Sequence, residues 1–300
     1  MRSAVNETRG SAHLAPLAAA LLRELPKQRI RAIQGDRWVL YPRAKQAMAV
    51  LNRLVAHPRT TRMPSVAIYG DSGMGKTMIM ERFCSEHPTR FDPEAGVERT
   101  PVLALQMAGK PGERRLYVQL LAALGLPPPS PRASVVDLEQ AALRLLRAID
   151  VQVLLIDEVH NILAGSHRDQ RVVLNTLRYL SNELKLSLVC FGVAEAREAI
   201  SGDAQLARRF DEFTLGRWSA DAEFEALVTA ILRNLPLHEP SVLSAQSVRR
   251  LLQITDGLTA RVFRALNELA IEAILSGREC IGDEAVERWT PTFDAEAAFA

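Results

Sequence analysis

Long apolar runs and closely spaced cysteines are both missing from this sequence of 300 residues. No apolar run approaches the roughly 20 residues that a membrane-spanning helix needs, and Leu14–Leu22 is short and lacks a signal-peptide cleavage pattern. Cys84, Cys190 and Cys280 are about a hundred residues apart, which suits neither a zinc site nor a disulfide framework. We therefore expect a cytoplasmic protein without membrane contact, with reduced cysteines in its core.

A strong overall charge is also absent, since the net charge is only +2. The positive charge is nevertheless concentrated, because residues 1–60 contain eleven Lys and Arg against three acidic residues, a local balance of +8 that leaves −6 for the remaining chain. Such a basic front end is either a solvated surface or a contact for nucleic acid or an acidic partner. The sequence leaves both open.

One stretch has the full pattern G-x-x-x-x-G-K-T of a phosphate-binding loop. It reads Gly70-Asp71-Ser72-Gly73-Met74-Gly75-Lys76-Thr77. The apolar run Ser65–Tyr69 precedes it and the helically spaced segment Met78–Cys84 follows it, which is the strand, loop and helix order that such a loop requires. A glycine-rich turn without a nucleotide is the alternative, and the complete pattern in this setting disfavours it.

The residue types in this loop suit a nucleoside triphosphate. Glycines let the backbone form a nest of N–H donors at the positive end of the following helix. Lys76 would reach the β- and γ-phosphates, and Thr77 is placed to put its hydroxyl on Mg²⁺. We therefore predict a site for ATP with Mg²⁺.

Two carboxylates end a second apolar strand, about residues 151–158, some eighty residues after Lys76. Asp157 fits a role in holding Mg²⁺, directly or through water, and Glu158 fits the role of polarising the water that attacks the γ-phosphate. A strand-end pair that merely caps a loop is the alternative, which the upstream phosphate loop makes less favourable.

The order of predicted elements indicates an α/β fold with a parallel sheet covered by helices on both sides. Apolar strands at 101–106, 151–158 and 186–192 alternate with helices at 113–124, 135–148 and 170–184, whereas the chain after residue 221 shows almost only helical spacing. We predict a flexible or helical extension over residues 1–29, an α/β nucleotide-binding domain over 30–217 and a small helical lid with an acidic, frayed tail over 218–300. Residues 30–42 read as an extended basic arm in front of the domain.

Three arginines are candidates for cations that stabilise the transferred phosphoryl group. Arg208 and Arg209 follow the last predicted core strand, where an arginine reaching into a neighbouring subunit would lie, although a surface pair forming salt bridges is the alternative. Arg261 begins a lid helix after Asp256-Gly257 and could reach the γ-phosphate from the lid, and an ordinary surface role is as compatible with the sequence.

Taken together, these motifs resemble an AAA+ ATPase, and within that superfamily the TniB family of transposition proteins, relatives of the TnsC target-selection ATPases. The segments that carry the resemblance are Asp36–Pro42, Gly70–Thr77, Leu155–Ser166, Leu180–Leu184, Gln205–Phe210, Arg217-Trp218 and Leu235–Leu237. Asp157-Glu158-Val159-His160 also resembles a helicase box, but residues 220–300 are too few and too helical for the second motor domain that a helicase needs. His160 is expected to pack or hydrogen-bond locally.

The resemblance implies a protein of the bacterial cytoplasm that binds duplex DNA in an ATP-dependent manner. It further implies rings or helical filaments with ATP between subunits, and delivery of a DDE transposase, with a TniQ-type adaptor as a further partner. One departure is Val193, which stands where the family usually has a Thr after the strand's Gly192. A polar side chain there normally faces the attacking water, so the rate of hydrolysis is in question.

No helix-turn-helix or zinc module is visible, so contact with DNA must come from elsewhere. We select the loop that contains Lys110, Arg114 and Arg115, because loops at this place in AAA+ rings tend to face the central channel and these cations suit phosphate contacts that read no sequence. A plain exposed loop is the alternative. Two other functions stay open: a helicase-loader or initiator-like AAA+ ATPase, and a nucleotide-gated scaffold that hydrolyses little ATP.

Overall fold

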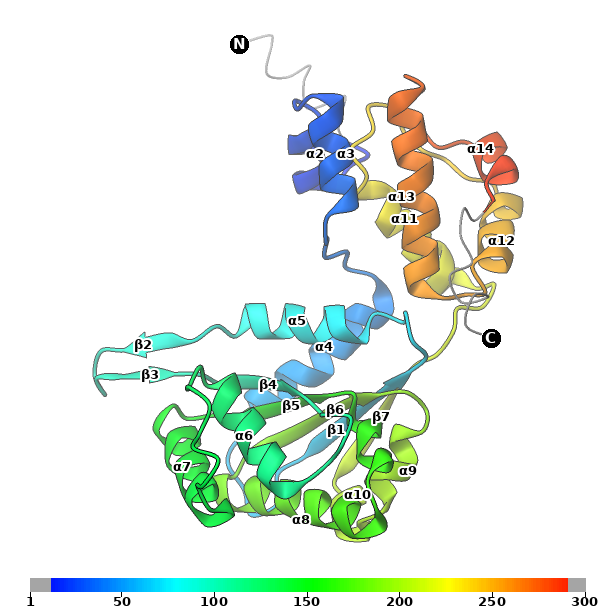
Figure 1. Ribbon diagram of the computed structural model, residues 1–300. Coiled ribbons are helices and arrows are strands. Elements are labelled where there is room, and N and C mark those ends of the chain that lie inside the picture. The colour runs from blue at the N-terminus through cyan, green and yellow to red at the C-terminus, as the bar shows by residue number, and fades with distance from the viewer. Residues whose placement is uncertain (1–11, 291–300) are drawn as a thin grey trace. The chain divides into compact units, whose positions relative to one another are not determined.

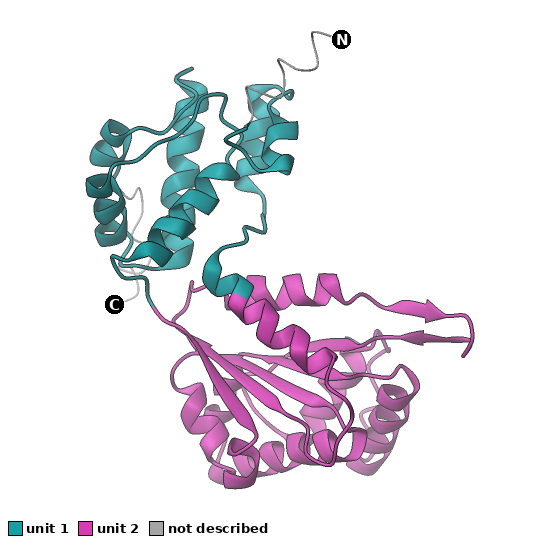
Figure 2. Ribbon diagram, turned by 180° about the vertical axis from the view of Figure 1, so that it is seen from behind, with its two compact units in different colours: residues 1–45, 217–300 teal, residues 46–216 magenta. Residues whose placement is uncertain are grey.

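The computed structural model of the protein describes residues 12–290. The chain divides into two compact units, residues 1–45 with 217–300 as the first and residues 46–216 as the second (Figure 2). None of the helices in the described range is both long and apolar enough to cross a membrane.

The second unit is built on a five-stranded sheet in which every neighbouring pair is parallel. Its strand order is β4-β5-β6-β1-β7. The strands are β1 (Ser65–Gly70), β4 (Val102–Gln106), β5 (Val153–Asp157), β6 (Ser187–Gly192) and β7 (Phe210–Leu215). β1, β5 and β6 are buried along their whole length, which explains their nearly continuous apolar sequences.

Helices cover both faces of this sheet (Figure 1). They are α4 (Pro42–Val55), α5 (Lys76–Glu86), α6 (Glu113–Ala123), α7 (Val135–Ala148), α8 (His167–Leu184), α9 (Ala196–Ser201) and α10 (Ala204–Ala207), with the 3₁₀ helix η1 (Val159–Ala164) after β5. α4 and α5 lie on one face, whereas α6, α7 and α8 lie on the other and form one apolar core with alternate residues of the strands. A short hairpin, β2 (Arg90–Asp92) and β3 (Val97–Arg99), extends beyond α5 (Figure 1).

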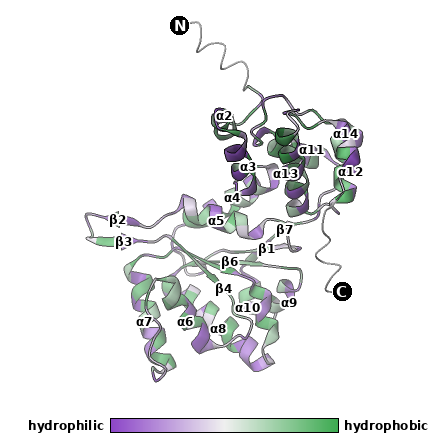
Figure 3. Ribbon diagram, turned by 45° about the horizontal axis from the view of Figure 1, so that its top comes forward, coloured by the Kyte–Doolittle hydropathy of each residue, from purple (hydrophilic) through white to green (hydrophobic). Residues whose placement is uncertain are grey.

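The first unit is helical in its described residues. It contains α2 (Pro16–Leu21), α3 (Pro26–Gln34), α11 (Ala222–Arg233), α12 (Ala245–Ile254), α13 (Thr259–Leu275) and α14 (Asp283–Arg288). α11 and α13 are predominantly hydrophobic (Figure 3), and their buried side chains form the centre of this unit. A prediction of an α/β domain with a small helical lid is therefore confirmed at the level of fold class.

The N-terminal segment is grouped differently from the predicted division. The buried Arg29 of α3 donates to both carboxylate oxygens of Glu279, at 2.7 and 2.6 Å, and to the carbonyl of Pro236 at 2.9 Å. Because a buried guanidinium needs such partners, α3 is fastened to the helices after residue 217. Within the described residues, 12–45 therefore belong with the lid, and residues 30–45 do not belong with the nucleotide domain.

Local predictions were wrong at three other places. Residues 26–34 form α3 instead of an extended arm from residue 30, because Pro26 opens a helix and does not only end the previous one. The hairpin β2–β3 and the strand β7 were missed, since most of their side chains are exposed and their sequences lack an apolar run. The first eleven residues of the predicted flexible or helical extension, and residues 291–300 of the predicted frayed tail, lie outside the described residues.

Candidate functional site

The loop between β1 and α5 has the backbone geometry of a phosphate cradle. Gly73 and Gly75 adopt the left-handed region, with φ of 79° and 91°, which glycine enters without steric cost. A Cβ on Gly70 would lie 2.7 Å from the carbonyl oxygen of Leu215, so only glycine fits between β1 and β7. α5 begins at Lys76, and its first N–H groups and positive dipole end therefore point into the loop.

Lys76 is held inside this loop by the chain itself. Its ammonium donates to the carbonyl oxygens of Gly70 at 2.6 Å and of Asp71 at 3.0 Å, and the residue is only 6% exposed. Burial lowers the pKa of Lys76, while the carboxylates of Glu158, Asp157 and Asp71 act in the opposite direction. Lys76 thus lies between the loop carbonyls and three carboxylates, and its role toward phosphates stays a prediction.

Asp157 ends β5 and approaches the start of α5. Its Oδ2 atom lies 3.4 Å from the hydroxyl oxygen of Thr77, and its side chain is buried. A carboxylate and a hydroxyl side by side are the hard oxygen ligands that Mg²⁺ uses together with phosphates and water. No cluster of three or more His, Cys, Asp or Glu in residues 12–290 could hold a metal by itself, so the pair fits an ion that is shared with a nucleotide.

Glu158 follows in a left-handed conformation, with φ of 54°. Its backbone N–H donates to Oδ1 of Asp157 at 2.9 Å, and its carboxylate Oε2 lies 3.2 Å from Nε2 of His160. The sequence predicts only local packing or hydrogen bonding for His160 and does not connect it with Glu158. Nothing in the spacing of the two residues signalled this contact, because it depends on the unusual φ of Glu158.

A cavity of about 580 Å³ lies beside the loop, at the end of β6. Its lining is formed by the phosphate loop, η1 and the start of α9: Asp71, Ser72, His160, Leu163, Val193, Ala194 and Glu195. Val193 thus faces the nucleotide side with an apolar side chain. Ser187 lies at the opposite, amino end of β6, so it cannot replace the polar group that Val193 lacks.

The two arginines of the predicted pair differ sharply in their surroundings. They lie immediately before β7, which is a correction, since the sequence placed them after the last core strand. Arg209 is half-buried and donates to Oδ1 of Asn182 at 2.7 Å, and its pKa is lowered first by burial and then by Arg62 and Arg178. Arg208 is exposed, and within residues 12–290 its side chain makes no hydrogen bond or ion pair.

The support beneath this pair was also missed by sequence reasoning. Arg178 forms an ion pair with Asp203 at 3.0 Å. The same carboxylate caps α10 by accepting from the backbone N–H groups of Gln205 and Leu206. An aspartate directly before a helix was the signal that could have revealed this cap.

The remaining predicted site residues lie elsewhere. Arg261 is in α13 of the first unit and forms an ion pair with Asp256. Lys110 and Arg115 are exposed in the loop after β4, where Arg115 donates to the carbonyl of Lys110 at 3.0 Å. Arg114 is half-buried and donates to the carbonyls of Ser130, Pro131 and Ala133, so it holds the neighbouring proline-rich loop.

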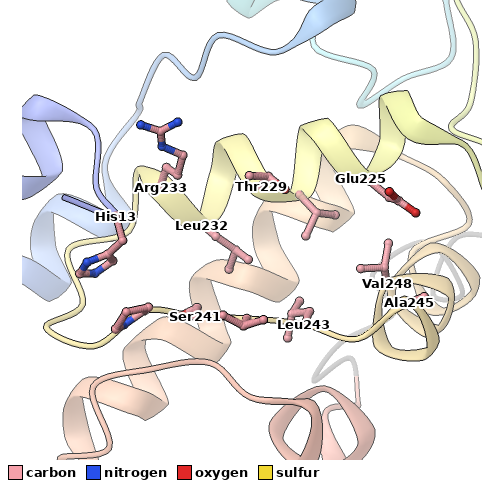
Figure 4. A pocket seen from close by; sticks show the side chains of 12 residues that line it. His13, Glu225, Thr229, Leu232, Arg233, Ser241, Leu243, Ala245 and Val248 are labelled. Atoms are coloured by element: carbon pink, nitrogen blue, oxygen red, sulfur yellow. The ribbon is translucent and has the colours of Figure 1, made fainter. Parts of the chain in front are cut away.

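The first unit has a cavity of its own, of about 420 Å³, between α11 and the segment 240–248. Figure 4 shows Thr229 and Leu232 of α11 facing Leu243 and Val248 across it. None of the predicted site residues lines this cavity, and its lining lacks a phosphate loop. The chemistry of a nucleotide site is therefore concentrated in the second unit.

Comparisons with known proteins agree with this geometry. The model of the bacterial TniB protein family matches residues 29–220. The comparison with curated protein sequences finds no match.

Solved structures of similar fold include three archaeal proteins. The Aeropyrum pernix ORC2 protein, in ADPNP and ADP complexes, has 17% identity and a TM-score of 0.59 over 86% of this chain and 70% of its own. Cdc6p from Pyrobaculum aerophilum has 16% identity and a TM-score of 0.58 over 89% of this chain and 73% of its own. The Aeropyrum pernix ORC1 protein in complex with DNA has 17% identity and a TM-score of 0.55 over 82% and 63%.

At such identities the structures establish the fold, whereas the family model spans more than half of the chain. The structure brings the glycine loop, the Thr77–Asp157 pair and Glu158 together at the carboxyl ends of β1 and β5. The chain thus belongs to the TniB family of bacterial proteins and is an AAA+ ATPase.

Proposed function

We propose that this ATPase is a transposition protein that assembles on target duplex DNA in an ATP-dependent manner and recruits or activates a DDE transposase. In this proposal Gly70–Thr77 binds ATP, while Thr77 and Asp157 hold Mg²⁺. When bound, the ion would neutralise charge on the β- and γ-phosphates. Glu158 orients the attacking water, and a TniQ-type adaptor is a further candidate partner.

Assembly is supported by one observation in particular, the position of Arg208. The backbone N–H of Ser65 donates to the carbonyl of Arg209 at 3.0 Å, so the arginine pair lies at the amino end of β1 and β7. The phosphate loop lies at the opposite end of β1, a strand of six residues and therefore roughly 20 Å away. An exposed arginine there cannot serve its own nucleotide, but it can serve that of a neighbouring subunit.

The two arginines then have separate roles. Arg208, exposed and without a partner in the described residues, contacts the phosphates of the neighbour's ATP. Arg209 donates a hydrogen bond to Asn182 and lies close to Arg62 and Arg178. These residues are the platform beneath Arg208, because they hold the adjoining backbone in place. Arg261 remains a candidate for a lid contact to the nucleotide.

Contact with DNA is assigned to the loop after β4. Lys110 and Arg115 have exposed side chains that suit phosphate contacts. Arg114 contributes to the loop mainly by binding the carbonyls of residues 130–133. The proposal therefore expects Lys110 and Arg115 to matter more for DNA affinity than Arg114.

Electron microscopy of the protein with an ATP analogue and duplex DNA tests the assembly. Rings or helical filaments that require both ligands are expected, and Lys76→Ala provides a control in which they are absent. Dispersed monomers under all conditions would contradict the proposal.

A second function is favoured by Val193, which places an apolar side chain beside the nucleotide cavity. The protein would then be a nucleotide-gated scaffold in which assembly itself is the signal and ATP turnover is slow. Measuring ATP turnover with and without DNA, alongside Glu158→Gln, separates the two functions. Assembly with a negligible rate that DNA does not raise favours the scaffold. A helicase-loader or initiator-like role is the third candidate, because such proteins have the same fold. Electron microscopy of the DNA-bound particles tests this role as well.

A further inference from the structure

The carboxylate of Glu158 has a built-in partner, His160. The distance from Nε2 of His160 to Oε2 of Glu158 is 3.2 Å. An ionised carboxylate only accepts hydrogen bonds, so a proton on Nε2 is what makes this polar contact favourable. The contact restricts the direction in which the carboxylate points.

The backbone is shaped to bring these two side chains together. Glu158 adopts a left-handed φ of 54°, a conformation that costs a non-glycine residue roughly 1–2 kcal/mol. The turn is closed by a hydrogen bond from the N–H of Asn161 to the carbonyl of Glu158 at 2.9 Å. The amide of Asn161 in turn donates to the carbonyl of Met107 at 3.0 Å, which anchors η1 to the end of β4.

The other ring nitrogen of His160 has a different environment. Nδ1 is buried and has no hydrogen-bond partner within the described residues. Buried N–H groups without a partner are rare in native structures, whereas buried acceptors without one are less so. The arrangement therefore favours the tautomer with the proton on Nε2, the nitrogen that contacts Glu158.

His160 also lines the cavity beside the phosphate loop, together with Asp71, Ser72 and Val193. Val193 provides no hydrogen-bonding side chain at the end of β6. A Cβ on the preceding Gly192 would lie 3.7 Å from the backbone nitrogen of His160, so the first turn of η1 packs closely on this end of the strand. Within this lining, His160 is the side chain that contacts the carboxylate of Glu158.

We infer that His160 is a positioning residue for ATP hydrolysis. By donating to Glu158 from the wall of the cavity, it holds the carboxylate in the direction of the attacking water, and so takes over an orienting role that Val193 cannot perform. The inference rests on the role proposed above for Glu158. It explains how the site can keep a well-oriented carboxylate without a polar residue at position 193.

Three substitutions at His160 distinguish this role from packing. The amide nitrogen of Gln lies near the position of Nε2, whereas that of Asn lies near Nδ1, which contacts no acceptor. We expect His160→Ala and His160→Asn to lower kcat about tenfold or more, with KM and the Kd of a fluorescent ATP analogue changed less than about twofold. His160→Gln should retain most of kcat. The inference would be overturned if the Gln and Asn variants had equal kcat, or if the losses in kcat of the three variants followed their losses in unfolding temperature.

Double substitutions test the path through Glu158. In a Glu158→Gln background, His160→Ala should cause no further loss, because residues that act as a unit are not additive. Val193→Thr should restore part of the turnover of His160→Ala. A rise in kcat for His160→Ala alone would instead mean that His160 restrains Glu158, and it would contradict the inference.

A readout independent of turnover uses ¹⁵N-labelled histidine in the nucleotide-free protein, with His160→Gln identifying the signal. We expect the Nε2–H tautomer and a shift of this signal in Glu158→Ala; the opposite tautomer or an unchanged signal would overturn the inference. The proposed role of Glu158 fails separately, if Glu158→Gln keeps the turnover of the unsubstituted protein. If Glu158→Gln is inactive but His160→Ala is not, only the role of His160 is wrong.

Discussion

The two edges of the parallel sheet carry polar groups in opposite situations. At the carboxyl edge, Lys76, Asp157 and Glu158 all have hydrogen-bond partners within the chain. At the amino edge, Arg208 is exposed and has none within residues 12–290. At the carboxyl ends of the strands, the polar groups are thus held in place without a ligand. At the amino ends, the exposed Arg208 is available to contact another molecule.

Under the proposed function, this difference makes hydrolysis depend on assembly. The groups proposed to bind nucleotide lie together in one subunit, whereas the cation that completes the site would come from the next subunit. ATP turnover per subunit should therefore increase with protein concentration and reach a plateau when assembly is complete. A turnover that is independent of concentration, in a range where the protein dissociates, would remove the distinction between the two edges.

The largest effect is expected from Lys76→Ala, which removes the ammonium group from the carboxyl ends of the strands. Without the ammonium, the carboxylates of Asp71, Asp157 and Glu158 face the phosphates with less opposing charge, so nucleotide binding should weaken beyond detection. Calorimetric titration with ATP measures this, and Lys76→Arg is the matched control that keeps the charge but not the compact shape. Binding of ATP at unchanged affinity by Lys76→Ala would show that the loop is not the nucleotide site.

The next largest effect is expected from Arg208→Ala, which removes the exposed cation from the amino ends of the strands. A cation supplied in trans is worth on the order of 10³ in turnover, so we expect a loss of that size with nucleotide affinity nearly unchanged. Mixing Arg208→Ala with Glu158→Gln provides the sharper measurement, because both variants keep the nucleotide loop and can assemble. Each variant is inactive alone, but in a mixed assembly an intact Arg208 faces a site with an intact Glu158, and turnover should partly return.

No return of activity in mixed particles of normal size would mean that Arg208 acts within its own subunit or not at all. Arg197→Ala is a control on the surface of the same unit. Arg197 already forms an ion pair with Glu212, and its loss should leave turnover unchanged.

Sequence patterns located the carboxyl edge well and the amino edge poorly, for a physical reason. The loop glycines and the strand ending in Asp157 and Glu158 are local patterns, and the fully buried strands around them are apolar throughout. β7 is the outermost strand next to β1 and has three of its six residues exposed, so its sequence has no apolar run to reveal it. The arginine pair was therefore placed after the core instead of before its last strand.

Contacts between distant segments were the other limit. The pairing of Arg29 with Glu279 joins residues 250 positions apart, and no local pattern predicts such a partner. His160 lies only two residues from Glu158, yet their contact depends on the left-handed backbone at Glu158, which sequence periodicity cannot show. Both examples are polar contacts, whereas periodicity reports mainly on apolar burial.

A smaller effect is expected at the platform beneath Arg208. Asn182→Ala removes the acceptor that holds Arg209 at 2.7 Å, and a hydrogen bond to a charged group contributes about 1.5–3 kcal/mol to the ordering of its partners. We expect turnover to fall about tenfold, less than for Arg208→Ala. Arg171→Ala, at an exposed position on the same helix α8, is the control. If Asn182→Ala equals Arg208→Ala in effect, the division of roles between the two arginines is wrong.

The smallest effect on ATP turnover is expected at a third surface, the loop after β4. Because Lys110 is exposed and bound to no phosphate in the free protein, Lys110→Ala should leave ATP binding and stability unchanged. Each cation that contacts a DNA phosphate contributes about one unit to the slope of log affinity against log salt concentration. We therefore expect that slope to fall by about one unit per DNA-bound subunit for Lys110→Ala and for Arg115→Ala.

Arg114→Ala should instead lower the unfolding temperature, because its guanidinium donates to three carbonyls of the neighbouring loop. Fluorescence anisotropy with labelled duplex at several salt concentrations measures the slopes, and unchanged slopes for both Lys110→Ala and Arg115→Ala would exclude this loop from the DNA interface.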